Sequence, residues 1–196
     1  MTRIIAGRAG GVRLDVPRSG TRPTSDRVRE SLFASLEATG LIEGAQVVDL
    51  YAGSGALGLE CASRGAAAVD LVERSQTAAA LARRNAEGVR RAIGSGAARV
   101  RVHPVAVRSF LRSTAPGIDI AFLDPPYDLA DDALTEDLAL LAPLMTEGSL
   151  VVVERSSRSP SPDWVAAGLS PWRDRSYGDT TLWWGEPQPS ASSQSR

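Results

Sequence analysis

The sequence predicts an α/β fold in which a seven-stranded, mostly parallel sheet is covered by helices on both faces. From residue 45 to residue 154, five short runs rich in Val, Ile and Leu alternate with segments of helical spacing. This alternation is typical of parallel strands joined by crossover helices. Two more strands meet at Gly178-Asp179, a turn that favours an antiparallel hairpin closing the sheet. The length of 196 residues suits one domain.

Each expected element is placed by its own local signals. Two short apolar runs around a glycine turn predict an N-terminal β-hairpin over 3–7 and 11–16. Ser25 or Asp26 can cap a helix that stops near Gly40. The remaining helices are expected at 59–64, 76–91, 105–111 and 131–142. The remaining strands are expected at 46–51, 67–73, 99–102, 118–123, 149–154, 169–177 and 180–184.

These elements divide the chain into a basic β-hairpin arm and loop (1–24), a main domain (25–185) and a polar tail (186–196) that we expect to be disordered. A single cysteine, Cys61, excludes an internal disulfide and a cysteine metal cluster, and no metal site is predicted. The sequence contains neither an apolar run of about 20 residues nor a secretory signal, so we expect a cytoplasmic protein with no membrane partner.

Positive charge is concentrated at the start of the chain. The net charge is −1, yet residues 1–30 hold seven arginines against three acidic residues, a balance of +4. A basic arm on an acidic body indicates contact with nucleic-acid phosphates, with an ordinary solvated surface as the alternative. The candidate RNA-binding residues of this region are Arg3, Arg8, Arg13, Arg22 and Arg27.

A glycine loop follows the first core strand. Gly53, Gly55 and Gly58 fit the pattern G-x-G-x-x-G, in which glycine permits a sharp turn and the close approach of a ligand to the backbone. Asp49 places a carboxylate where it can meet a cationic amino group, and Glu73, at the end of the second core strand, can accept both ribose hydroxyls. These residues predict a nucleotide cofactor and leave NAD and S-adenosylmethionine (SAM) open.

The tetrapeptide Asp124-Pro125-Pro126-Tyr127 distinguishes between NAD and SAM as the candidate cofactor. An exocyclic base amine is a poor nucleophile until acceptors hold its N–H groups and return electron density to nitrogen. Asp124 and the Pro125 carbonyl can accept those hydrogens, the two prolines stiffen the backbone, and Tyr127 can stack on the base. The tetrapeptide therefore predicts methyl transfer from SAM to an exocyclic amine of a nucleic-acid base, with Asp124, Pro125, Pro126 and Tyr127 as the catalytic residues.

With these motifs in place, residues 3–185 resemble the small-subunit rRNA guanine-N2 methyltransferase family (RsmD-type). The resemblance lies in the arginine arm, Arg22-Pro-Thr-Ser-Asp-Arg-Val-Arg-Glu-Ser-Leu-Phe, the glycine loop from Asp49 to Glu60, the tetrapeptide, and Tyr177-Gly-Asp-Thr. It implies a Rossmann-like SAM methyltransferase fold for the main domain. It also implies methylation of N2 of one guanine in 16S rRNA, within the assembled or assembling 30S subunit.

The resemblance also implies roles for individual residues. Arg22, Thr24 and Arg27 would lie at the mouth of the site, against cofactor or RNA. Where related enzymes often carry Asp or Asn for the adenine amine, this chain has Ala106, so adenine contact would come from backbone or a neighbour such as Val105. The cofactor-binding set that follows is Asp49, Tyr51, Gly53, Gly55, Glu73, Ala106 and Thr24, with Asp49, Gly53 and Gly55 on the methionine portion and Glu73 on the ribose.

Three other functions remain open on the sequence. They are an N6-adenine DNA methyltransferase, a NAD-dependent oxidoreductase, and a non-catalytic RNA-binding assembly factor. A base within a helix cannot enter such a pocket, so the target must be unpaired or flipped outward. We expect the protein to act as a monomer, with Trp172 in the core and His103 at the surface or in packing.

Overall fold

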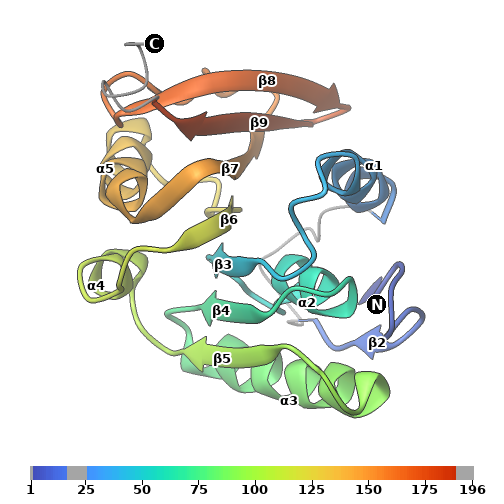
Figure 1. Cartoon of the computed structure of the whole chain (residues 1–196). Helices are drawn as coiled ribbons and strands as arrows, with labels where there is room; N and C mark the ends of the chain where they lie inside the picture. Colours follow the sequence, from blue (N-terminus) through green and yellow to red (C-terminus); the bar gives the residue numbers. More distant parts are fainter. Residues whose placement is uncertain (1, 17–25, 189–196) are drawn as a thin grey trace, which may run out of the picture.

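The computed structural model describes residues 2–16 and 26–188, and a seven-stranded sheet forms its centre (Figure 1). The strands of this sheet are β3 (Gln46–Leu50), β4 (Ala68–Val72), β5 (Arg99–His103), β6 (Ile118–Leu123), β7 (Met145–Ser156), β8 (Leu169–Tyr177) and β9 (Thr180–Pro187). They lie in the order β5-β4-β3-β6-β7-β9-β8. The first five are parallel, and β9 pairs antiparallel with both β7 and β8. The predicted parallel sheet with a C-terminal antiparallel hairpin is confirmed.

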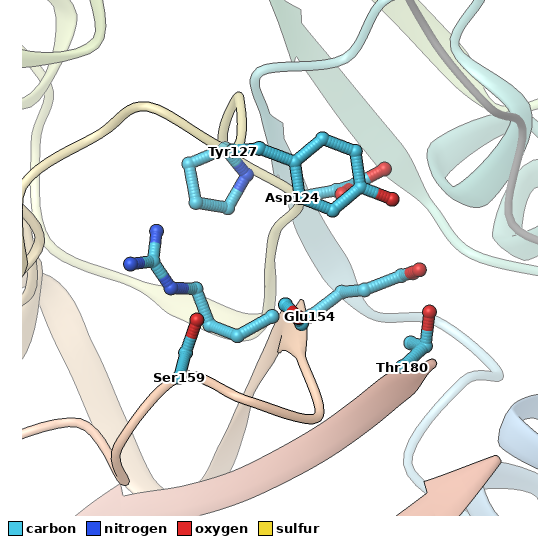
Figure 2. A pocket seen from close by; sticks show the side chains of 8 residues that line it. Asp124, Tyr127, Glu154, Ser159 and Thr180 are labelled. Carbon is cyan, nitrogen blue, oxygen red and sulfur yellow. The ribbon is translucent and has the colours of Figure 1, made fainter. Parts of the chain in front are cut away.

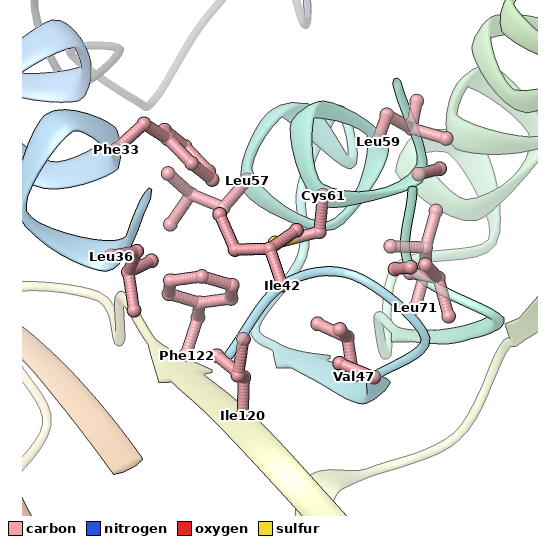
Figure 3. Close-up of a cluster of buried hydrophobic side chains, with 14 of the residues drawn as sticks. Phe33, Leu36, Ile42, Val47, Leu57, Leu59, Cys61, Leu71, Ile120 and Phe122 are labelled. Carbon is pink, nitrogen blue, oxygen red and sulfur yellow. The ribbon is translucent and has the colours of Figure 1, made fainter. Parts of the chain in front are cut away.

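Helices cover both faces of this sheet (Figure 1). The helices are α1 (Asp26–Glu37), α2 (Ala56–Ser63), α3 (Gln76–Ile93), α4 (Val107–Leu111), α5 (Asp131–Leu141) and the 3-10 turn η1 (Ala142–Leu144). Alternate residues of each strand enter opposite cores. Phe122 packs with α1 and α2, where its ring centroid lies 6.0 Å from that of Phe33 (Figure 3), whereas Leu123 packs with α4 and α5. Cys61 is fully buried in the first core, as expected of a packing residue.

The start of the chain is packed against the body. β1 (Thr2–Arg3) and β2 (Arg13–Leu14) form a two-stranded antiparallel sheet, shorter than the predicted strands 3–7 and 11–16. The buried carboxylate of Glu60 on α2 accepts backbone N–H groups from Ile5 at 2.7 Å and Ala6 at 3.0 Å. At Gly7, an added Cβ would lie 2.2 Å from the backbone oxygen of Ser63. These contacts fix the N-terminal hairpin on α2.

The parallel register gathers strand-ending residues at one edge of the sheet. Leu123 of β6 pairs with Leu50 of β3 on one side and with Val153 of β7 on the other. The next residues along these strands, Tyr51, Asp124 and Glu154, therefore lie side by side at the carboxyl edge. Strand order reverses here between β4-β3 and β6-β7, and such reversals are where α/β sheets bind ligands.

The structure corrects several predicted boundaries. α2 begins at Ala56, three residues before the predicted start, and α3 extends to Ile93. α4 begins at Val107, two residues after the predicted start, because Val105 lies in a bend and Ala106, the N-cap, has extended backbone. β9 continues to Pro187, so the first two residues of the predicted tail belong to the sheet, and 189–196 lie outside the described residues. Trp172, predicted in the core, is 41% exposed at the irregular pairing of β8 with β9.

Within residues 2–16 and 26–188, none of the helices combines the length and apolar character that a bilayer crossing requires.

Candidate active site

The glycine loop between β3 and α2 is a sharp turn with three residues in left-handed backbone. The φ angles are +66° at Tyr51, +54° at Gly53 and +79° at Gly55. Tyr51 is the one residue with a side chain in this conformation among the described residues, and its hydroxyl donates a hydrogen bond to buried Asp137 of α5. Arg108 of α4 donates to the same carboxylate at 2.9 Å. α4 and α5 thus hold the tyrosine that opens the loop.

Two carboxylates flank the loop. Asp49 is buried, and its Oδ2 accepts the N–H of Gly58 at 2.9 Å. Burial, with a smaller contribution from the charge of Glu73, raises the pKa of Asp49 to about 7. Glu73 accepts the N–H groups of Gly53 at 3.0 Å and Ser75 at 2.6 Å, and so ties the end of β4 to the loop. The result is a concentration of negative charge beside an open stretch of glycine backbone.

Three residues of the predicted tetrapeptide, Asp124, Pro125 and Tyr127, line a pocket at the carboxyl end of β6 (Figure 2). Pro126 is exposed and is not part of its wall. The pocket is small and open to solvent, and its walls are formed by Asp124, Pro125, Tyr127, Glu154, Arg155, Ser156, Ser159 and Thr180. Burial raises the pKa of Asp124 well above its usual range, and the charges of Glu154 and Asp49 raise it further. Tyr127 is 69% exposed, so its ring is available to an incoming ligand.

Five residues of this pocket were missed on the sequence, which are Glu154, Arg155, Ser156, Ser159 and Thr180. Arg155 is buried, and its Nη2 donates to the Leu129 carbonyl at 3.1 Å and to Asp131 at 2.8 Å, which holds the segment after the tetrapeptide against β7. Glu154 was read only as the end of a strand, although it follows a buried Val-Val-Val run much as Asp124 follows its own strand. Thr180 joins the pocket through the pairing of β9 with β7, which the sequence does not reveal.

The predicted adenine contact lies near the loop's second carboxylate. Ala106 is exposed and forms the N-cap of α4, where its carbonyl accepts the Phe110 N–H at 3.1 Å. At the preceding strand end, Glu73 donates its backbone N–H to the His103 carbonyl at 3.1 Å, which brings β4 and β5 together. A role for Ala106 in holding adenine stays a prediction.

The predicted RNA-binding arginines are in different situations. Arg3, Arg13 and Arg27 are exposed. The guanidinium of Arg8 donates to the carbonyls of Ile93, the last residue of α3, and of Ser95 and Gly96 after it, so it stabilises the fold locally. Arg22, like the cofactor candidate Thr24, lies outside the described residues. In the described part of the chain, no three His, Cys, Asp or Glu side chains gather in a way that could hold a metal ion.

Comparison with known proteins places this architecture in a family. The family described as "Conserved hypothetical protein 95" matches residues 2–186. The chain belongs to this family. Ribosomal RNA small subunit methyltransferase D of Escherichia coli strain K12 is 39% identical over 181 residues, which cover 90% of this chain and 85% of the relative. The predicted resemblance to the RsmD-type methyltransferases is therefore confirmed.

Solved structures extend the comparison to the fold. A hypothetical protein of Thermus thermophilus is 32% identical, with a TM-score of 0.78, and the match covers 94% of this chain and 98% of that one. Magnesium protoporphyrin IX methyltransferase of Synechocystis PCC 6803 with bound SAM matches with a TM-score of 0.66 over 83% of this chain and 79% of that chain. At 16% identity the latter shows the fold alone. This family member has the Rossmann-like SAM-dependent methyltransferase fold predicted from its sequence.

Proposed function

We propose that the protein transfers the methyl group of SAM to the exocyclic N2 amine of a guanine in 16S rRNA. The observation that carries the proposal is that Asp124, Pro125 and Tyr127 line a pocket at the end of β6, the strand that pairs with β3 just before the glycine loop. The relatives named ribosomal RNA small subunit methyltransferase D support rRNA as the substrate class.

The residues around the loop fit SAM as the cofactor. Asp49 is a carboxylate whose pKa is raised by burial, and a cationic ammonium group beside it would favour its ionised form. A Cβ placed at Gly53 would meet only the Tyr51 oxygen at 4.0 Å, so this glycine leaves space against the backbone that a side chain would fill. Glu73 lies at the end of β4, where it can bind ribose hydroxyls. When bound, SAM supplies a methyl group on a positively charged sulfur that leaves as a neutral thioether.

The pocket residues prepare the amine for attack. Asp124 acts after it has released its own proton: as a carboxylate it accepts one N2 hydrogen while the Pro125 carbonyl accepts the other, and the nitrogen lone pair is thereby directed toward the methyl group. Tyr127 stacks on the base and orients it. As the new N–C bond forms, the N2 proton becomes acidic and passes to Asp124, whose raised pKa makes its carboxylate a better base than an exposed aspartate.

The partner that we propose is RNA whose target base is flipped or unpaired. Exposed Arg3, Arg13 and Arg27 fit a role in holding phosphates, while RNA shape selects the site. We further propose that the substrate is the assembled or assembling 30S subunit, and that the protein acts as a cytoplasmic monomer.

The proposal is tested by transfer of labelled methyl from SAM to small subunits purified from cells lacking this enzyme, followed by nucleoside analysis. Naked 16S rRNA and duplex DNA are assayed in parallel. We expect label in N2-methylguanosine of the RNA. Asp124→Ala should lower the rate by about 10²–10³-fold with unchanged SAM affinity, since it removes one preorganised acceptor. Glu147→Gln, an exposed change at the opposite end of β7, is the matched control.

Two other outcomes of this assay would each indicate a different function. Label confined to N6-methyladenine in DNA would make the protein an adenine DNA methyltransferase. Binding of RNA without any transfer would indicate an assembly factor that retains SAM for its structure alone.

A further inference from the structure

Glu154 and Thr180, two residues outside the tetrapeptide, line the same pocket as Asp124. Leu123 pairs with Val153, so Asp124 and Glu154 occupy the next register position on adjacent parallel strands. Glu154 in turn pairs with Leu182, and Ser156 with Thr180, on the antiparallel strand β9. Figure 2 shows the Glu154 side chain extending between Asp124 and Tyr127 above it and Thr180 below it. Three neighbouring strands thus contribute to the pocket: β6 the carboxylate of Asp124, β7 the carboxylate of Glu154 and β9 the hydroxyl of Thr180.

The electrostatics agree with this proximity. Glu154 is the charged group with the largest effect on Asp124 and, after burial itself, the main reason that the Asp124 pKa is raised. Asp49, from β3, is the other acidic group that acts on it. Two carboxylates held this close favour a ligand that brings hydrogen-bond donors to both of them.

Among the bases, guanine presents that pattern along its Watson–Crick edge. Its N2 amine and N1–H are adjacent donors, and O6 beyond them is an acceptor. Adenine and cytosine place an unprotonated ring nitrogen next to their exocyclic amine. With the amine at Asp124, that lone pair would face the second carboxylate, which in its ionised form can only accept, so no hydrogen bond could form.

We propose that Glu154 and Thr180 select guanine: Glu154 accepts the N1–H and Thr180 donates its hydroxyl to O6, while Asp124 and the Pro125 carbonyl hold the N2 amine. This inference rests on the proposed function, because it takes methyl transfer to N2 as the reaction. It gives the two strand-end carboxylates separate tasks, with Asp124 at the reacting amine and Glu154 at the atom that distinguishes guanine from adenine. A site built around such hydrogen bonds rejects a base whose edge carries the wrong donors and acceptors, since a ring lone pair set against a carboxylate is repelled.

The probe that separates these tasks is 2,6-diaminopurine, which keeps the N2 amine but replaces the N1–H by a lone pair and O6 by an amine. After the labelled guanine has been located, 16S rRNA is ligated with either base at that position and reconstituted into subunits. The readout is the ratio of kcat/KM for guanine to that for diaminopurine. We expect the wild type to prefer guanine by about 100-fold or more, as expected for a site that pairs with a polar edge.

Glu154→Gln should lower kcat/KM for guanine about tenfold or more, because the charge-assisted hydrogen bond to N1 is lost. It should also narrow the preference over diaminopurine about tenfold, since a glutamine amide can donate to the N1 lone pair. Thr180→Val should lower kcat/KM for guanine by a smaller factor than Glu154→Gln does. It should also reduce the preference for guanine over diaminopurine. Glu147→Gln, on the same strand, should match the wild type in every readout.

SAM affinity and thermal unfolding of each variant are measured to exclude loss of the fold. A guanine preference that stays unchanged in Glu154→Gln and Thr180→Val, with SAM affinity retained, would overturn the selective role and leave the proposed function standing. Absence of N2-methylguanosine with the wild-type protein would overturn the proposed function, and this inference with it.

Discussion

At the scale of single residues, Asp49 is the group whose protonation links the fold to its cofactor. Burial raises its pKa to about 7, so the folded protein binds this proton more tightly than the unfolded chain does. The stability that the neutral carboxyl provides is therefore lost as pH rises toward 7 and through it. A cationic ligand beside Asp49 reverses this preference, because it stabilises the ionised form.

SAM affinity should consequently depend on pH through Asp49. Below about pH 7 we expect the Kd of SAM to rise by up to about tenfold per pH unit, since binding must first release the proton. Asp49→Asn keeps an acceptor for the Gly58 N–H, and it should bind SAM weakly with little dependence on pH. Calorimetry between pH 5.5 and 8.5 in two buffers measures both affinity and proton release. A wild-type Kd that is constant over this range would contradict the role of Asp49, and Glu147→Gln is the control.

At the scale of secondary-structure elements, α2 is positioned by the closeness of its first turns to β3 and β4. A Cβ at Gly58 would lie 2.5 Å from a methyl group of Leu71, 2.8 Å from Val69 and 3.2 Å from the Cβ of Asp49. The third glycine of the loop motif is therefore needed for helix–sheet packing, and only through that packing does it set the position of Asp49.

Gly58→Ala should lower the free energy of unfolding by about 1–3 kcal/mol, because the added methyl overpacks a closed interface. Gly88→Ala is the matched comparison, since Gly88 lies inside α3 and a Cβ there would meet no atom within 4 Å. That change should raise stability by about 0.5–1 kcal/mol through the better helix propensity of alanine. Urea unfolding of both variants measures the difference. If Gly58→Ala and Gly88→Ala changed the free energy of unfolding in the same direction, contact of residue 58 with β4 would not be the cause of the destabilisation.

The same elements show what the sequence could predict. Asp49, Glu73 and Asp124 could be placed at strand ends from the sequence, and the carboxyl ends of parallel strands meet at one edge whatever the details of packing. Glu154 ends a strand in the same way and could have been placed with them, whereas the position of Thr180 depends on how β9 pairs with β7. Trp172, predicted in the core, is exposed at the irregular pairing of β8 with β9. Pairing between strands distant in the chain is tertiary information that local periodicity does not contain.

At the scale of the whole molecule, the N-terminal segment is hydrogen-bonded to α2 and α3 and exposes positively charged side chains. Glu60 and Ser63 of α2 bind the backbone of residues 5–9, and Asn85 of α3 bonds both the N–H and the carbonyl of Asp15. The hairpin therefore stands in a fixed place relative to the sheet. Its two strands pair Arg3 directly opposite Arg13, and both side chains are exposed.

This placement predicts that RNA affinity and SAM affinity can be separated by mutation. Arg3→Glu with Arg13→Glu should weaken binding to 16S rRNA about tenfold or more at 0.1 M salt, and should make the slope of log K against log salt shallower by about 1–2, since two phosphate contacts are lost. The Kd of SAM should stay unchanged, because both side chains are exposed, and the hydrogen bond from Asn85 to the Ser54 carbonyl of the glycine loop involves neither of them. Filter binding over a salt series and calorimetry measure the two affinities.

The comparison variant is Arg99→Glu with Arg112→Glu, which reverses the same amount of charge on exposed residues, one at the amino end of β5 and one just after α4. If a local phosphate contact matters, this pair should retain most of the RNA affinity and the full salt slope. Equal weakening by both pairs would show that only net charge is sensed. Loss of SAM affinity together with RNA affinity in the hairpin variant would show that the hairpin supports the cofactor site itself.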